Sequence, residues 1–275
     1  MTDPSHINYS ELDHPEILAL IFHQRVEETY GPAGKNPAGY MFIPVGEGQS
    51  IGARLHHSGK DAPTILFFHG NGEIVADYDD LGPVYAGNGI NFLPVDYRGY
   101  GRSTGTPTVT GMMRDCHLIF QYIKEWLGSN HYTGPIIIMG RSLGSASALE
   151  LAANYRDDID GLIIESGFAY AIPLLKLLGI NIDAFGITEK TGFHNHNIEM
   201  IRKFDKPTLI IHAEYDQVIS IKEGEALFDA CAADIKKFLK IPNADHNTIF
   251  VHGFEIYLAE VKELCNCLRI EPDIL

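Results

Sequence analysis

Short apolar runs alternate with longer amphipathic stretches over most of the chain. The short runs predict β-strands, several of them apolar on both faces as buried parallel strands are, at Thr64–Phe68, Ile90–Val95, Pro135–Met139, Gly161–Ile164, Thr208–Ile211 and Lys237–Ile241. The amphipathic stretches have helical spacing and lie near residues 73–88, 110–127, 143–155, 221–233 and 247–268. Because strands and helices alternate, we expect an α/β fold with a mostly parallel central sheet and helices on both faces.

The N-terminal part of the chain follows a different pattern. Apolar residues recur at helical spacing between His14 and Glu28 and predict a short amphipathic helix. Residues 31–37, rich in Gly and Pro, predict a loop. Tyr40–Pro44 and Ile51–His56 predict an antiparallel hairpin. A helix, a loop and a hairpin are therefore expected ahead of the parallel strands.

One interval breaks the alternation. Residues 167–206 follow the strand predicted at Gly161–Ile164 and contain an apolar helical stretch, Phe168–Ile180, before a mixed polar segment. An insertion at the carboxyl edge of a sheet is where a lid over a ligand crevice lies. We therefore expect one domain over residues 1–275, with residues 1–39 as its N-terminal helix and loop and residues 167–206 as a short lid insertion.

The composition is that of an ordinary globular protein, with 45% hydrophobic and 21% charged residues among 275. Asp and Glu number 36 against 21 Lys and Arg, and the net charge of −15 opposes binding to nucleic acids and anionic membrane surfaces. No apolar run approaches the ~20 residues that cross a bilayer. The first residues lack the features of a secretory signal, and the four cysteines lack zinc-type spacing and are expected to be reduced. These features favour a cytoplasmic protein without a membrane span.

The pattern Gly-x-Ser-x-Gly occurs at residues 140–144, directly after a predicted strand and at the start of a predicted helix. A tight strand-to-helix turn holds such a serine in a strained conformation that exposes its hydroxyl, and a Cβ at the flanking glycines would strike neighbouring atoms. The turn also aims the free N–H groups of the helix start at the serine. Ser142 is therefore the predicted nucleophile.

A second Gly-x-Ser-x-Gly match surrounds Ser103, at residues 101–105. It follows a loop-like run, Asp96–Tyr100, instead of a strand, and Pro107 stands where an elbow would need helix. Ser103 is predicted to be an ordinary loop hydroxyl.

The predicted strand Thr64–Phe68 ends in a turn with the sequence His-Gly-Asn-Gly. Such a turn can point a main-chain N–H at the carbon that Ser142 attacks, and the residue after the nucleophile supplies another donor. The predicted oxyanion-binding groups are therefore the N–H of Asn71 and the N–H of Leu143. For the side chain of His69 we favour bracing of nearby loops over direct catalysis.

The acid of such a site follows the serine in the chain. A loop with two carboxylates follows the strand predicted at Thr208–Ile211. Asp216 is the predicted acid because it lies just before a predicted helix. Ser220 and Glu223 are expected to form a capping box at the start of this helix. Glu214 is the rival, and we expect it to be solvated or to brace the loop.

His246 is the predicted base, because it follows the strand at Lys237–Ile241 and so lies on a loop at the same sheet edge as Ser142 and Asp216. The rival residues fit structural roles better: His212 lies in a strand, His252 on the last helix and Asp245 in a turn. His194 and His196 lie in the insertion, and their spacing is only a weak indication of a metal site.

In chain order, His69–Gly72, Asp96–Ser103, Gly140–Gly144, Asp216 and His246 resemble the motifs of α/β-hydrolase-fold serine hydrolases. The resemblance covers the chain from about Tyr40 to the last helix, and the short lid is similar to that of compact esterase, thioesterase and acyl-hydrolase-like members. It implies the α/β-hydrolase fold and a Ser-His-Asp triad, with Asp96–Ser103 as mainly architectural. These motifs are specific for the fold and not for the substrate.

The predicted function is cleavage of carboxylic ester or thioester bonds in a small-molecule acyl substrate, through an acyl-enzyme on Ser142. The apolar insertion favours an acyl chain, although its helix also fits simple packing on the sheet. We expect no metal or organic cofactor. Two other functions fit the same residues, a peptidase or amidase of the same fold and a catalytically inactive binding protein. The sequence does not indicate acyl chain length or oligomeric state.

Overall fold

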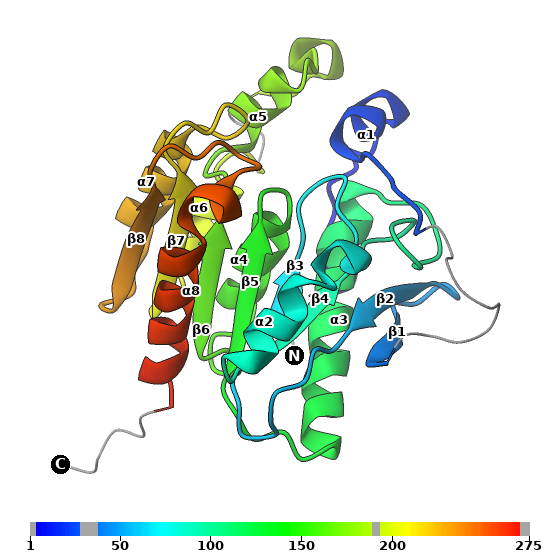
Figure 1. Ribbon diagram of the computed structural model, residues 1–275. Coiled ribbons are helices and arrows are strands. Elements are labelled where there is room, and N and C mark those ends of the chain that lie inside the picture. Colours follow the sequence, from blue (N-terminus) through cyan, green and yellow to red (C-terminus); the bar gives the residue numbers. More distant parts are fainter. Residues whose placement is uncertain (1–3, 28–37, 189–192, 270–275) are drawn as a thin grey trace. The chain divides into compact units, whose positions relative to one another are not determined.

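The computed structural model describes residues 4–27, 38–188 and 193–269 (Figure 1). The chain divides into two compact units, Met1–Gly134 and Pro135–Leu275. The single domain expected over the whole chain stays a prediction, because it concerns the relation between these units. The loop predicted at residues 31–37 lies outside the described residues.

The first unit contains four strands in the order β1-β2-β4-β3. Their bounds are β1 Tyr40–Pro44, β2 Ser50–Arg54, β3 Thr64–Phe68 and β4 Asn91–Val95. β1 and β2 pair antiparallel, which confirms the predicted hairpin, and β3 runs parallel to β4 with Phe68 opposite Val95. β3 and β4 are completely buried, as their continuous apolar sequences predict.

The helices of the first unit are η1 Pro4–His6, α1 Pro15–Ile21, η2 Val75–Tyr78, α2 Leu81–Gly87 and α3 Val109–Ser129. α1 is shorter than the helix predicted between His14 and Glu28, because the chain is already extended at Phe22. The helix predicted near residues 73–88 is divided into η2 and α2. α3 starts where the Thr108 hydroxyl accepts a hydrogen bond from the Gly111 N–H.

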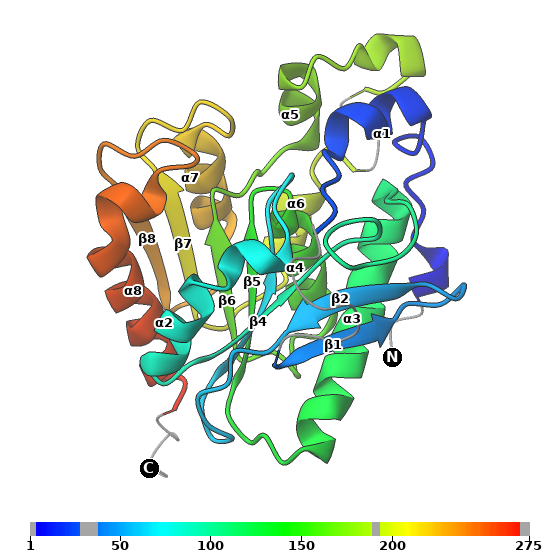
Figure 2. The same ribbon diagram turned by 45° about the vertical axis from the view of Figure 1, so that its right-hand side comes forward.

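The second unit is built on a parallel sheet with the order β5-β6-β7-β8. Its strands are β5 Ile136–Arg141, β6 Gly161–Glu165, β7 Thr208–Ala213 and β8 Lys236–Ile241. Its longer helices are α4 Gly144–Asn154, α7 Ile221–Ala230 and α8 Ile249–Cys267. α8 covers one face of this sheet, and α4 and α7 lie on the other (Figures 1 and 2). The parallel order brings the carboxyl ends of all four strands to one edge.

The insertion at residues 167–206 contains α5 Ala171–Leu177, η3 Ile182–Phe185 and α6 His196–Ile201. The helix predicted at Phe168–Ile180 is therefore real but shorter. α6 packs against α4 and α7 and has four buried residues, so this part of the insertion belongs to the core. α5 is more exposed to solvent than α6, since the side chain of Leu177 at its end is 58% exposed. A lid role remains a prediction for α5 alone.

The capping box predicted for Ser220 and Glu223 is wrong in its second half. The Ser220 hydroxyl accepts from the Lys222 N–H at the start of α7, as an N-cap residue does. The Glu223 carboxylate instead accepts from the N–H groups of Ala169 (2.9 Å) and Tyr170 (3.0 Å). The Glu223 side chain therefore binds the segment before α5 and provides an acceptor for two of its main-chain N–H groups.

Two simpler expectations concern the whole described chain. No helix within the described ranges is long and apolar enough to cross a membrane. All four cysteines are free thiols, and burial raises the pKa of Cys265 to about 12.

The core of the second unit depends on apolar side chains between its strands and helices. Ile210 is completely buried in β7, opposite Ile164 of β6 and Phe238 of β8. We expect Ile210→Ala to lower the free energy of unfolding by about 2–5 kcal/mol, because it leaves a cavity in the packed core on one face of the sheet. Val251→Ala, at a position 78% exposed, serves as the control and should change it by less than about 0.5 kcal/mol. Urea unfolding measures both, and equal losses would contradict the assigned packing.

Candidate active site

Ser142 occupies the turn between β5 and α4 with a left-handed backbone, φ +51°. Its N–H donates to the Glu165 carbonyl at the end of β6, over 2.9 Å. Its own carbonyl accepts from the N–H (3.0 Å) and the hydroxyl (2.6 Å) of Ser145. Hydrogen bonds on both sides therefore stabilise a conformation that a non-glycine residue rarely adopts.

Gly140 allows the close approach of β5 and α4 that this turn requires. A Cβ at this position would lie 2.4 Å from the Gly144 carbonyl oxygen and 2.7 Å from the Cβ of Ala148. Both distances are shorter than van der Waals contact. The first glycine of the motif is thus needed for packing, as the pattern predicted.

Ser142, His246 and Asp216 form one hydrogen-bonded line. His246 lies on the loop after β8, and its Nε2 is 3.1 Å from Ser142 Oγ. Its Nδ1 is 2.7 Å from Oδ2 of Asp216, which lies on the loop after β7. Each of the three residues is less than a tenth exposed. Three residues distant in the chain thus meet at the carboxyl edge of one sheet.

The Asp216 carboxylate is held in its ionised form. Oδ1 accepts from the N–H groups of Val218 (2.9 Å) and Ile219 (2.8 Å), while Oδ2 faces His246. Burial by itself raises the pKa of Asp216, but the hydrogen bond and charge of His246 and the Ile219 N–H outweigh it, and the pKa lies below its usual value.

The ionised carboxylate decides which nitrogen of His246 carries a proton. A carboxylate only accepts hydrogen bonds, so the Nδ1 of the imidazole donates to Asp216. In the neutral ring Nε2 then has a free lone pair, and it faces the Ser142 hydroxyl. The arrangement can therefore transfer a proton from Ser142 to His246.

The two predicted oxyanion donors are both free main-chain groups. Leu143 directly precedes α4, and its N–H makes no hydrogen bond within the described part of the chain. The N–H of Asn71, in the first unit, likewise has no partner among the described residues. The Asn71 side chain holds its loop, since Oδ1 accepts from the N–H of His23 and the hydroxyl of Tyr100, each over 2.9 Å. That Asn71 and Leu143 act together stays a prediction.

Three rival residues make hydrogen bonds that fit the structural roles expected for them. Glu214 accepts from the Asn243 N–H and the Lys240 ammonium, which lower its pKa, and so braces the loop that leads to His246. Asp245 accepts from the N–H of Asn247 in an exposed turn. The Ser103 hydroxyl accepts from the Gly52 N–H in the first unit.

Three other histidines have structural contacts, and one of them, His212, also lies near the triad, with Nε2 3.5 Å from Oδ2 of Asp216. His212 is completely buried in β7, where burial lowers its pKa and Nε2 lies 2.8 Å from the Ile219 carbonyl. His69 is buried with Nδ1 2.7 Å from the Gly70 carbonyl, consistent with a bracing role. His196 Nε2 lies 2.9 Å from a Glu150 oxygen. Within the described ranges, no group of three or more His, Cys, Asp or Glu could hold a metal ion.

Sequence reasoning assigned no role to Arg141 or Glu165. Both are buried, and Glu165 is 1% exposed at the end of an otherwise apolar strand. A charged residue that ends a buried strand beside the nucleophile is a usable signal, because full burial of an unpaired charge is very unfavourable.

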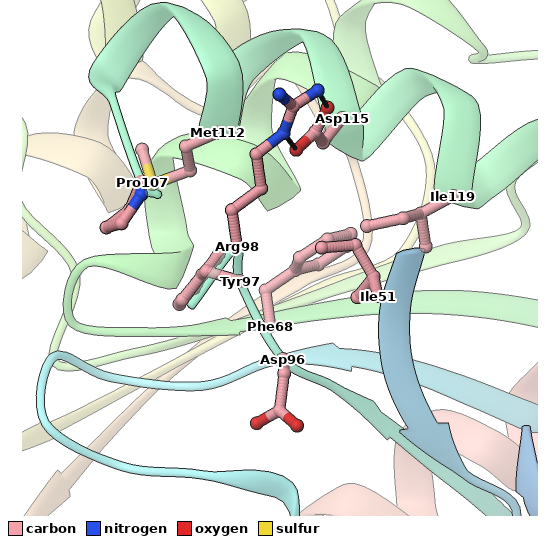
Figure 3. A pocket seen from close by; sticks show the side chains of 9 residues that line it. All are labelled: Ile51, Phe68, Asp96, Tyr97, Arg98, Pro107, Met112, Asp115 and Ile119. Carbon is pink, nitrogen blue, oxygen red and sulfur yellow. Dashed lines mark hydrogen bonds and ion pairs between the residues drawn. The ribbon is translucent and has the colours of Figure 1, made fainter. Parts of the chain in front are cut away.

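Two cavities lie near features singled out by the sequence. One of about 170 Å³ in the second unit is lined by α5 and the segment after Asp216, at Phe168, Pro173, Leu174, Leu177, Val218, Ile219, Ser220 and Glu223. The other, of about 10 Å³ in the first unit, has room for about one water. Figure 3 shows the Arg98 guanidinium beside it, paired with the carboxylate of Asp115. The pair that Arg98 forms with Asp115 of α3 fits the architectural role expected for Asp96–Ser103.

The lowered pKa of Asp216 predicts how stability depends on pH. Folding favours the ionised form, so the contribution is complete above the unfolded pKa of about 3.9 and is lost as the pH falls through the lower folded pKa. We expect Asp216→Asn to be less stable than the wild type at neutral pH, with the difference narrowing below about pH 4. Urea unfolding of both proteins between about pH 3 and pH 7 measures the difference in their free energies of unfolding. A difference that does not change with pH would contradict the assigned electrostatics.

Comparison with known sequences gives consistent results. The family described as serine aminopeptidase, S33, matches residues 59–184. Alpha/beta hydrolase domain-containing protein 17B of Xenopus tropicalis is 32% identical over 251 residues, which cover 89% of this chain and 81% of that protein. Protein bem46 of Schizosaccharomyces pombe is 31% identical over 195 residues, or 69% of this chain, and the match spans 63% of that protein.

Solved structures show the same fold. Est1E from Butyrivibrio proteoclasticus, in a structure with bound ferulic acid, is similar with a TM-score of 0.66 at 19% identity, covering 83% of this chain and 98% of that one. This similarity confirms the fold class expected from the strand and helix pattern. The 32% identity to the Xenopus protein, over most of both chains, shows that the chain belongs to the α/β-hydrolase family.

Proposed function

We propose that the protein is a serine hydrolase that cleaves carboxylic ester or thioester bonds through an acyl-enzyme on Ser142. The observation that carries the proposal is the hydrogen-bonded line from Asp216 through His246 to Ser142. A hydroxyl in this arrangement becomes a nucleophile because a base can take its proton as it attacks. Membership in a hydrolase family supports the same chemistry.

The first half of the reaction forms the acyl-enzyme. Ser142 Oγ attacks the substrate carbonyl while His246 Nε2 takes the hydroxyl proton. Asp216 keeps the Nδ1 proton in place and stabilises the imidazolium that forms. The N–H groups of Leu143 and Asn71 bind the oxygen on which negative charge develops, and one such donor typically stabilises the transition state by about 3–4 kcal/mol.

The acyl-enzyme is complete when the bond from the carbonyl carbon to the leaving alcohol or thiol breaks and the His246 imidazolium protonates that group. The second half releases the acyl group: the neutral His246 ring takes a proton from water as the water oxygen attacks the acyl carbon. Ser142 recovers its proton when the acid departs. His246 carries every proton transfer, so the proposed reaction uses no metal or organic cofactor.

The cavity beside α5 supports an acyl group as the part of the substrate that is recognised. Its lining is mainly apolar, and Val218 and Ile219 belong both to this lining and to the loop that holds Asp216. Apolar lining with a few polar groups is typical of small-molecule sites. The match to a serine aminopeptidase family favours amide bonds as a second candidate, so amides belong in the test.

Removal of the Ser142 hydroxyl tests the proposal directly. We expect Ser142→Ala to lower kcat/KM for p-nitrophenyl esters by at least about 1,000-fold and to abolish labelling by a fluorophosphonate probe. Ser103→Ala is the matched control, because it changes the serine of the other Gly-x-Ser-x-Gly match, and it should retain activity and labelling. Full activity of Ser142→Ala would refute the proposal, and turnover of aminoacyl amides but not esters would favour the peptidase alternative.

The length of the acyl group tests the role of the cavity. Leu174→Trp places a larger side chain in its lining, so we expect kcat/KM for esters of medium-length acids to fall about 10-fold while acetate ester cleavage is little changed. A series of p-nitrophenyl esters measures this with both proteins. Equal losses for short and longer esters would show that α5 does not recognise the acyl group.

A further inference from the structure

We propose that the buried ion pair of Arg141 and Glu165 positions the catalytic base, by linking the main chain of His246 to the turn that holds Ser142. Arg141 Nη1 donates to Glu165 Oε1 over 2.5 Å, and Nη2 donates to the carbonyl oxygen of His246 over 2.9 Å. Arg141 directly precedes the nucleophile in the chain. One guanidinium therefore joins the elbow, the end of β6 and the base loop.

Glu165 binds both Arg141 and the main chain of the nucleophile. Its main-chain carbonyl accepts from the Ser142 N–H over 2.9 Å, while its carboxylate Oε1 binds Arg141. Its second oxygen, Oε2, accepts from the Tyr257 hydroxyl of α8 over 2.7 Å. The residue that fixes the nucleophile's backbone thus also holds, through Arg141, the backbone of the base.

The burial of this pair indicates a geometric purpose. Arg141 is 7% exposed and Glu165 and Tyr257 are each 1% exposed. Removing two charges from water is costly, and well-packed apolar side chains often stabilise a core equally well. A planar guanidinium offers what apolar side chains lack, two donors at a fixed angle that bind a carboxylate and a carbonyl together.

The base loop needs such an anchor. The Tyr215 N–H donates to the Ala244 carbonyl, and these two residues tie the loop to the segment after β7. Beyond Ala244 the neighbours of His246 are exposed. The imidazole must meet Asp216 and Ser142 at the same time, and a displacement of about 1 Å is enough to slow a reaction roughly 100-fold. Arg141 supplies a further contact, at the carbonyl oxygen of His246 itself.

The inference rests on the proposed hydrolase function and is tested with the full chain. We expect Arg141→Met to lower kcat for a p-nitrophenyl ester about 10- to 100-fold with KM nearly unchanged, because substrate contacts remain while proton transfer is misaligned. The rate of fluorophosphonate labelling at Ser142 should fall by a similar factor. Arg156→Met is the matched control, since Arg156 forms a half-exposed two-point pair with Asp205, and it should leave both rates unchanged.

Two gentler variants keep the test decisive if Arg141→Met does not fold. Arg141→Lys retains the charge but has one nitrogen for two acceptors, so kcat should again fall with KM nearly unchanged. Tyr257→Phe keeps the ring and removes the hydroxyl that donates to Glu165 Oε2, and a smaller fall in kcat, about two- to fivefold, is expected. Circular dichroism and thermal unfolding establish that each variant is folded.

The outcomes separate the two proposals. Folded Arg141 variants with the wild-type kcat and labelling rate overturn the positioning role while the hydrolase function stands. A loss that appears in KM and not in kcat also overturns it. A wild-type protein that neither hydrolyses the esters nor labels at Ser142 overturns the proposed function and this inference with it.

Discussion

The contact between His246 Nε2 and Ser142 Oγ is the one on which the proposed chemistry depends. A serine hydroxyl is a weak nucleophile until a base accepts its proton during attack. The contact depends on the positive φ of Ser142, which hydrogen bonds to Glu165 and Ser145 stabilise, and on the close approach of β5 and α4 at Gly140. It also requires that Asp216 hold the other nitrogen of the ring as a donor. Loss of either condition would disable the base with all three side chains still present.

The polar groups of the site are buried, and each therefore needs a hydrogen-bond partner, because a buried polar group without one destabilises the fold. Asp216 accepts from two main-chain N–H groups as well as from His246, so its charge is stabilised and its orientation is determined. The pair of Arg141 and Glu165 follows the same principle, since each charge is matched by a partner that also joins separate segments. In both cases the groups that compensate burial also determine geometry.

The insertion after β6 divides into parts with different physical roles. α6 is buried against α4 and α7 and extends the core. α5 instead lines a cavity shared with the segment that follows Asp216, and it exposes Leu177. Glu223 connects the two regions of the unit, because its carboxylate binds the N–H groups of Ala169 and Tyr170 before α5. Substrate recognition is therefore proposed for α5 and not for the insertion as a whole.

The sequence by itself determined the order of strands and helices and the turn at residues 140–144, and it indicated Ser142, Asp216 and His246 as candidate site residues. Each depends on local periodicity, on a tight turn, or on a position just after a strand, and these signals act over a few residues. Only the tertiary structure decided that Glu223 binds a distant segment and that Arg141, Glu165 and Tyr257 form one network. These side chains come from separate elements, and a linear pattern does not specify which polar groups burial will bring within hydrogen-bonding distance.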